Sequence, residues 1–233
     1  VPEVSVGRLP VVTPEEMDAV VAKIAAYEAA SATGWANRAV FVADNPDAAG
    51  DFIADSSMLA QSVTGSLEVV TLEHDGSFSP YPVKTYIQNE FAQGIGLLNY
   101  IGHGGPDRLA NEGLFIKNDV AALSNGTASP LVLAMTCNVG RFTLPGYNCL
   151  MEELVLKPDG GAIGAWAPTG LSQNSFAVDL NRAFLQARYG DGEAVLGRVV
   201  LKASRAFSDE HGEDVFGMLR IYNVIGDPAL QLK

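Results

Sequence analysis

The sequence predicts an α/β fold built on an open, mostly parallel β-sheet with helices on both faces. Short β-branched segments alternate with longer segments of helical periodicity along the 233 residues, which is the pattern of consecutive strand–helix units. Three strand segments, 96–100, 131–135 and 162–166, carry apolar residues on both faces. That pattern is typical of strands at the covered centre of a parallel sheet.

The first elements are marked by local signals. A strand is expected at residues 4–6. The next helix has a clear start, because Thr13 can act as its N-cap, Pro14 suits the first helical position and Glu16 completes a capping box. Apolar residues then recur at helical spacing as far as Tyr27, which predicts a helix with one apolar face.

The remaining elements follow from the same periodicities. Strands are expected at residues 38–43, 67–72, 95–101, 130–136 and 161–167. Helices are expected at residues 51–62, 83–93, 147–156, 175–189 and 193–207. A strand that is reached through a crossover helix runs parallel to its predecessor, so most of these strands should be parallel.

Composition excludes several classes of function. The formal charge is −12, from 15 Lys and Arg against 27 Asp and Glu. So acidic a protein is a poor partner for phosphate backbones, and nucleic-acid binding is not expected. The apolar runs fall well short of the ~20 residues of a membrane-spanning helix. Two cysteines cannot form a disulfide framework or a four-thiolate metal site.

Candidate catalytic residues follow three of the predicted strands. Asp44, His103 and Cys137 each come just after a strand, and ligands of open α/β sheets bind beyond the carboxyl ends of the strands. A thiol, a base and an acid that orients the base form a set for nucleophilic catalysis. Taken singly, Cys137 could be a buried small hydrophobe and Asp44 a turn residue. Their shared position at strand ends favours catalysis.

A metal centre is not expected. No two histidines have the spacing of ligands on one helix, and Cys137 and Cys149 are 12 positions apart, so zinc is disfavoured. His74 is expected to be a solvated surface group in a polar turn. The acidic segment 209–214 could hold a structural Ca²⁺, although it lacks EF-hand spacing. No cofactor is expected to be required.

Five short motifs together resemble the gingipain-type cysteine peptidases, a family of the caspase-like clan. Segment 99–104 (NYIGHG) resembles the histidine motif of that family, and segment 137–142 (CNVGRF) resembles its cysteine motif. The other three are segments 149–152 (CLME), 225–230 (IGDPAL) and 6–10 (VGRLP). They occur in the order found in the family and extend over nearly the whole chain.

The resemblance implies a caspase-like fold and a catalytic mechanism. Residues 1–233 would form a single caspase-like catalytic domain, with residues 1–10 as the joint from a missing upstream subdomain. Cys137 would be the nucleophile, His103 the general acid/base, and Asp44 the residue that orients His103. The backbone N–H groups of Gly104 and Cys137 would form the oxyanion hole.

The resemblance also implies a substrate preference. Such peptidases cleave after Arg or Lys because an acidic side chain lines the pocket for that residue. Asp51 is the first candidate for this acid, although its position also suits a helix N-cap. Asp179 is a second candidate, and Phe176 would form a wall of the pocket.

The family context implies a secreted or cell-surface bacterial enzyme that acts on a protein or peptide. Two alternatives remain open at this point. The chain could be a transpeptidase of the same fold, in which an amine rather than water takes the acyl group from Cys137. It could also be a catalytically inactive binding domain.

Overall fold

The computed structural model describes residues 3–76, 79–212 and 215–233. Within these residues the main sheet has seven strands. They are β1 (Gly7–Arg8), β2 (Arg38–Ala43), β3 (Glu68–Glu73), β4 (Leu97–Ile101), β8 (Leu131–Met135), β9 (Gly164–Pro168) and β10 (Tyr222–Ile225). Their order is β1-β10-β9-β8-β4-β2-β3, and the five strands from β9 to β3 are mutually parallel. The predicted fold class is therefore confirmed.

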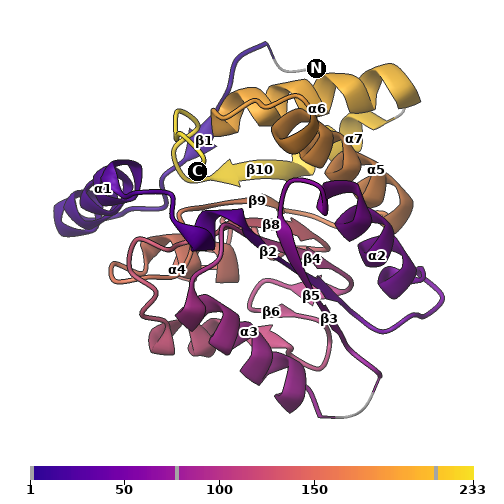
Figure 1. The fold of residues 1–233 in the computed structure, drawn as a ribbon, viewed down its shortest axis with the longest axis horizontal. Coiled ribbons are helices and arrows are strands. Elements are labelled where there is room, and N and C mark those ends of the chain that lie inside the picture. Colours follow the sequence, from indigo (N-terminus) through magenta and orange to yellow (C-terminus); the bar gives the residue numbers. More distant parts are fainter. Residues whose placement is uncertain (1–2, 77–78, 213–214) are drawn as a thin grey trace.

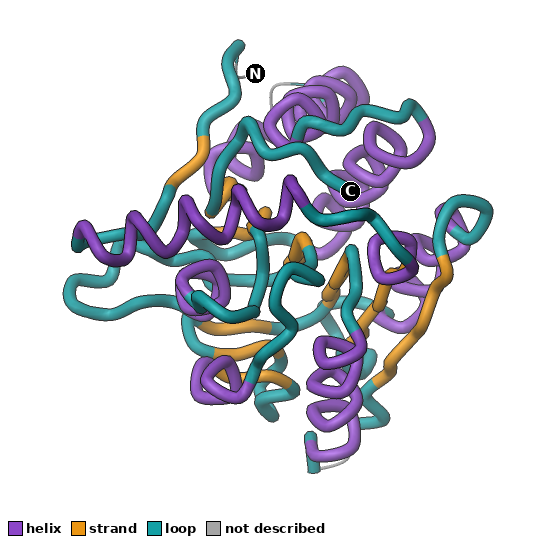
Figure 2. Tube along the Cα trace, turned by 60° about the vertical axis from the view of Figure 1, so that its left-hand side comes forward, coloured by secondary structure: helices purple, strands orange, loops and turns teal. Residues whose placement is uncertain are grey.

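Helices cover both faces of this sheet. They are α1 (Pro14–Ala29), α2 (Phe52–Val63), α3 (Tyr81–Gln93), α4 (Leu150–Leu156), α5 (Asn174–Leu185), α6 (Leu196–His211) and α7 (Phe216–Ile221). Buried apolar residues form two clusters, one between the sheet and α2, α5 and α6, the other between the sheet and α3 and α4 (Figure 1). Figure 2 shows the strands, in orange, running between these helices.

The central strands are apolar on both faces because both faces are covered. Phe41 of β2 and Leu133 of β8 belong to the first cluster, whereas Val40 and Val132, one residue earlier on the same strands, belong to the second. Successive side chains of a strand point to opposite faces of the sheet, so a strand between two helical layers needs apolar residues at every position. The double-sided apolar pattern in the sequence has this origin.

Buried polar contacts lock helices to the sheet. Asn99 of β4 and Asn181 of α5 exchange two amide hydrogen bonds, at 2.8 and 3.3 Å, and both side chains are buried. The Lys23 ammonium of α1 donates to the carbonyl oxygens of Leu154, Val155 and Lys157, which satisfies the end of α4. The α1 start has the predicted capping box, with Thr13 as N-cap.

Several features differ from the sequence expectations, among them α7, a helix that the periodicity did not predict. The first strand covers Gly7–Arg8 rather than residues 4–6, and it pairs with β10, a strand that the periodicity did not predict. A small second sheet also follows β4, made of β5 (Gly104–Gly105), β6 (Arg108–Leu109) and β7 (Phe115–Ile116). These strands are too short for period-2 alternation to be visible.

Residues 1 and 2 of the expected joint lie outside the described residues. Among the residues that the structure does describe, no helix combines the length and the apolar character needed to cross a membrane.

Candidate active site

Three strand ends bring the predicted catalytic residues to one edge of the sheet. β4 lies between β2 and β8, and all three strands are parallel. Ile101, the last residue of β4, is in register with Ala43 of β2 and Met135 of β8. The residues that follow these strands therefore emerge side by side. They include Asp44 and His103.

The Asp44 carboxylate holds the backbone at His103. Its Oδ2 accepts from the His103 N–H at 3.0 Å, and its Oδ1 accepts from the Asn45 N–H at 2.9 Å. Burial raises the pKa of Asp44, the two backbone donors oppose that rise, and the negative charge of Glu112 adds to it. Asp44 is thus placed to position His103, but its contact is with the main chain and not with the imidazole ring.

Asp47, which the sequence reasoning missed, binds the imidazole of His103. The distance from Asp47 Oδ2 to His103 Nε2 is 2.7 Å, and this hydrogen bond is the main cause of the lowered pKa of Asp47. The other carboxylate oxygen accepts from the Ala49 N–H at 2.7 Å, which fixes the turn. The edge of Phe52 packs on the imidazole, with ring centroids 5.3 Å apart. Asp47 follows Asp44 by three residues. The presence of two acidic residues in this turn was the sequence signal that could have identified Asp47.

Hydrogen bonds and a glycine fix the turn that carries His103. The His103 carbonyl oxygen accepts from the Tyr100 hydroxyl at 2.6 Å and from the Ala110 N–H at 2.8 Å. Gly102 has a φ of +149°, and a Cβ there would lie 2.2 Å from the Cβ of Asp44. Only glycine fits this position without displacing Asp44.

Gly104 allows the histidine turn to pack directly on the segment that holds Cys137. A Cβ on Gly104 would lie 2.5 Å from Thr136 Oγ1 and 3.1 Å from the Cys137 carbonyl oxygen. The contact shows that the two segments touch through their main chains. A larger residue at Gly104 would force them apart.

The Cys137 thiol is partly exposed and has a backbone donor. Its Sγ accepts from the Ser172 N–H at 3.3 Å. The thiol can also donate to the Ser172 carbonyl oxygen at 3.7 Å, so the Ser172 main chain fixes the position of the sulfur. The next residue, Asn138, has a φ of +60° and donates its N–H to the Gly170 carbonyl oxygen at 3.0 Å. The sulfur therefore lies against the segment after β9, at Ser172.

Two amides near the sulfur are available as donors. The Cys137 N–H has no acceptor in the described part of the chain. Gly104 pairs with Leu109, and the bond from the Ala110 N–H to the His103 carbonyl makes that pair the non-hydrogen-bonded type. The small sheet therefore leaves the Gly104 N–H unused. Both amides were predicted as oxyanion donors, and that role stays a prediction.

Asp51 is the N-cap of α2. Its Oδ1 accepts from the Ala54 N–H at 3.0 Å, and the following residue, Phe52, is the one that contacts the His103 ring. Asn174, at the start of α5, donates to Asp55 at 2.8 Å and ties the starts of the two helices together. Asp51 thus caps α2 and directly precedes the residue that contacts the His103 ring, and its predicted role in the substrate pocket stays a prediction.

Phe176 and Asp179 contact α6 instead. The Phe176 ring packs edge-on against the rings of Phe207 and His211, with centroids 6.1 and 5.2 Å apart. Asp179 pairs with Arg182 and lies 3.1 Å from His211 Nε2. Among the described contacts, neither residue reaches Cys137 or His103. Their predicted place in the substrate pocket stays a prediction.

The expectation for His74 is wrong. Its side chain is 1% exposed, because the residue directly follows β3 and its N–H donates to the Ala43 carbonyl oxygen at 3.0 Å. In the acidic segment 209–214, Glu213 and Asp214 lie outside the described residues, and the Glu210 carboxylate lies 3.4 Å from Arg182. Ca²⁺ binding there stays an expectation.

A cavity of about 880 Å³ lies along the β1–β10 edge of the sheet. It is bordered by β1, α6 and α7, and neither Cys137 nor His103 lines it. We place the candidate chemistry at the strand ends rather than in this cavity, because the thiol and the imidazole lie at the strand ends.

Comparison with known proteins identifies a family. The profile of peptidase family C25 matches residues 1–233. A search of curated protein sequences finds no match.

Several solved structures share the fold. The Arg-specific cysteine proteinase gingipain R (RgpB) superposes with a TM-score of 0.87 at 21% sequence identity, over 99% of this chain and 56% of that one. The complex of the pro- and mature domains of RgpB from Porphyromonas gingivalis gives 0.86 at 21% identity, over 99% and 57%. A further structure described as a protease gives 0.78 at 14% identity, over 95% and 54%. This chain thus spans little more than half the length of these structures.

The two cysteines should differ in reactivity. In the native protein at about pH 8, we expect iodoacetamide to alkylate Cys137 and to spare Cys149. Cys149 is fully buried, and burial raises its pKa to about 12, so its thiol stays protonated even when the pH rises by a further unit or two. Peptide mass spectrometry after labelling measures the modification at each site.

Two controls make this labelling decisive. Both cysteines should react once the protein is unfolded in urea, and Cys137→Ser should remove the native signal. Native labelling of Cys149, or none at Cys137, would contradict the assignment.

Proposed function

Because the chain belongs to peptidase family C25, we propose that it is a cysteine endopeptidase with Cys137 as nucleophile and His103 as general acid/base. One observation carries the proposal. The two residues follow register-paired strand ends, and Gly104 brings their segments into main-chain contact. The fixed imidazole and the N–H donor at the sulfur support the same assignment.

The proposed reaction proceeds in two halves. The Cys137 thiolate attacks the carbonyl carbon of the scissile peptide bond, and the N–H groups of Gly104 and Cys137 bind the resulting oxyanion. The C–N bond then breaks as His103 donates a proton to the leaving amine. This leaves a thioester on Cys137. Water attacks the thioester, His103 accepts its proton, and the acid product leaves with return of the thiolate.

Two acidic residues hold His103 through different contacts. Asp47 binds Nε2, so Nδ1 is the nitrogen left for exchange of the proton with substrate. Asp44 holds the main chain on which the imidazole is carried. In this proposal Asp47 orients the ring, and Asp44 fixes the turn.

Asp51 is the proposed determinant of specificity for Arg or Lys. It is an exposed carboxylate at the start of α2, adjacent to the residue that touches the His103 ring. A basic side chain placed beside the scissile bond could pair with it. The net charge of −12 would also attract cationic peptides, though only weakly at physiological salt.

We further propose that the enzyme acts on protein or peptide substrates outside the cell or at its surface, as part of a longer protein with an upstream subdomain. The support is family membership and the share of gingipain R that this chain covers.

Replacing the nucleophile should abolish cleavage. For Cys137→Ala in the full-length protein, we expect kcat/KM on a fluorogenic Arg or Lys peptide to fall by at least about 10⁴-fold, because the covalent step is lost. The matched control is Cys149→Ala, which should keep most activity. Equal turnover by Cys137→Ala and wild type would rule out the proposed nucleophile. Addition of an amine tests for ligated product, which would indicate transpeptidation instead.

The two acids should give different phenotypes. Asp47→Asn should lower kcat by about tenfold or more, since it weakens control of the imidazole. It should leave the unfolding free energy nearly unchanged, because the Asp47 side chain is 41% exposed. Asp44→Asn should cost about 1–3 kcal/mol of stability, because one of two buried backbone donors loses its acceptor. Urea denaturation and steady-state kinetics measure both effects, and a reversed pattern would contradict the division.

Asp51 should control the preference for basic residues. The effect of Asp51→Asn should be a drop in kcat/KM for Arg and Lys peptides of about tenfold relative to a matched Ala peptide. The amide keeps an oxygen to cap α2, so the fold should be retained. A peptide-library cleavage profile measures the change. An unchanged profile would exclude Asp51 as the pocket acid.

A further inference from the structure

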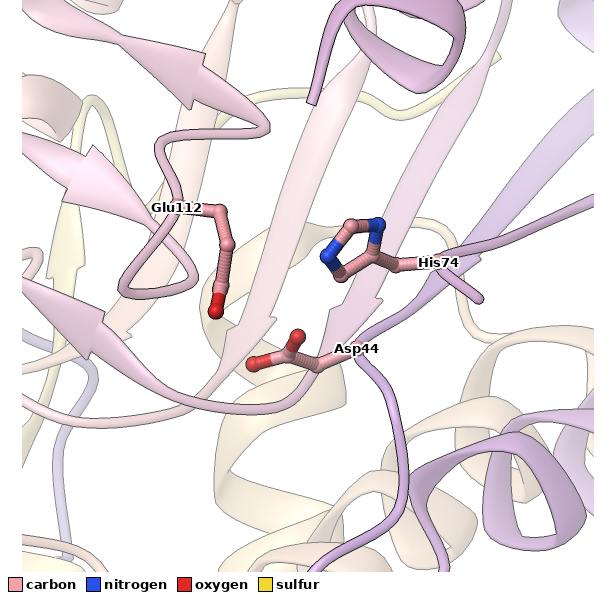
Figure 3. Close-up of side chains that lie close together, drawn as sticks. All are labelled: Asp44, His74 and Glu112. Atoms are coloured by element: carbon pink, nitrogen blue, oxygen red, sulfur yellow. The ribbon is translucent and has the colours of Figure 1, made fainter. Parts of the chain in front are cut away.

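Three potential metal ligands converge beside the His103 turn, and one of them, Asp44, also holds that turn. Asp44 follows β2, His74 follows β3, and Glu112 lies in the loop between β6 and β7. Each offers one ligand atom, and these atoms all lie within 4.8 Å of one another. Figure 3 shows the three side chains pointing into a common space from different segments. None of the three pairs has a spacing in sequence that would have indicated a metal site.

His74 provides an independent reason to expect a ligand here. Its side chain is 1% exposed, and its Nε2 has no hydrogen-bond partner among the described residues. A buried polar nitrogen normally finds a partner, because loss of water without replacement is unfavourable. An ion bound between His74 and the two carboxylates would supply the missing partner.

The charges also favour a cation. Asp44 is 1% exposed, and neither Asp44 nor Glu112 forms an ion pair with a lysine or arginine in the described part of the chain. A divalent ion would neutralise both carboxylates at once.

We propose that Asp44, His74 and Glu112 bind one divalent transition-metal ion of the Zn²⁺ class, with water in the remaining position. An imidazole nitrogen suits Zn²⁺ and its neighbours, whereas Ca²⁺ and Mg²⁺ prefer all-oxygen sites. Metal–ligand distances of about 2.0–2.2 Å require the ligand atoms to move somewhat closer together. Glu112 is an exposed side chain on a loop and can make that adjustment.

A second group of similar composition also has a buried imidazole nitrogen without a hydrogen bond, His211 Nε2, but its carboxylates pair with an arginine. Asp179, Glu210 and His211 also lie close together. There, however, Arg182 pairs with both acids, and His211 Nε2 is 3.1 Å from Asp179. Arg182 already offers both carboxylates a cationic partner, so this group serves as a control and not as a site.

The ion would brace the turn that carries His103. Asp44 accepts from the His103 N–H, and Ala110, two residues before Glu112, donates to the His103 carbonyl oxygen. Metal binding would therefore link Asp44 to the segment of Ala110 and Glu112, the two segments that hydrogen-bond to the main chain of His103. The ion would not contact substrate. The proposed metal site does not depend on the proposed peptidase activity.

The test measures binding of Zn²⁺ alone. Protein stripped with chelator and dialysed is titrated with ZnCl₂ by calorimetry, with CaCl₂ in a parallel titration. We expect one Zn²⁺ per chain and a rise in melting temperature with Zn²⁺ concentration. Co²⁺ should give visible absorption bands from a nitrogen- and oxygen-ligated ion.

Variants decide which residues bind the ion. Glu112→Gln and His74→Gln should each weaken Zn²⁺ binding by on the order of 100-fold, whereas Glu210→Gln should have no effect. If His74→Gln does not fold, the exposed Glu112→Gln decides by itself. No binding at millimolar Zn²⁺, unchanged binding in Glu112→Gln, or Ca²⁺ binding as tight as Zn²⁺ at this site would each overturn the proposal.

Discussion

The parallel alignment of β2, β4 and β8 is the constraint on which the site depends. Parallel strands release their following residues at one edge, and the matched register of Ala43, Ile101 and Met135 places those residues at one level. Helices on both faces are needed to bury such strands, and the two apolar clusters meet that need. The positions of Cys137 and His103 thus rest on this core, which reaches the imidazole of His103 through Phe52.

Close main-chain packing turns this shared edge into a site. Gly102 and Gly104 let the histidine turn lie against Asp44 on one side and the Cys137 segment on the other. Hydrogen bonds rather than apolar contacts then fix the turn, so its geometry depends on a few buried polar groups. The Asn99–Asn181 pair extends the same principle to α5, whose start is tied to α2.

Much of the fold and of the site was predictable from sequence, and the failures have physical causes. Periodicity located the central strands, so the positions of Asp44, His103 and Cys137 at one edge followed from topology. Asp47 was missed because its contact depends on how the turn after β2 folds back. His74 was misread because polar neighbours suggested exposure, whereas the fold buries it next to Asp44 and Glu112. Pairing of β10 depends on contacts distant in sequence, which local patterns do not encode.

The segment from Asp44 to Phe52 joins two tasks within one short stretch of chain. Asp44 and Asp47 hold His103, and Asp51 and Phe52 begin α2 beside its ring. An insertion or exchange in this loop alters the placement of His103, the proposed general acid/base, together with the side chain proposed to select the substrate. A change in this loop that alters substrate selectivity should therefore alter the turnover rate as well. In laboratory evolution of new cleavage preferences, substitutions in α5 should reduce turnover less than substitutions in this loop.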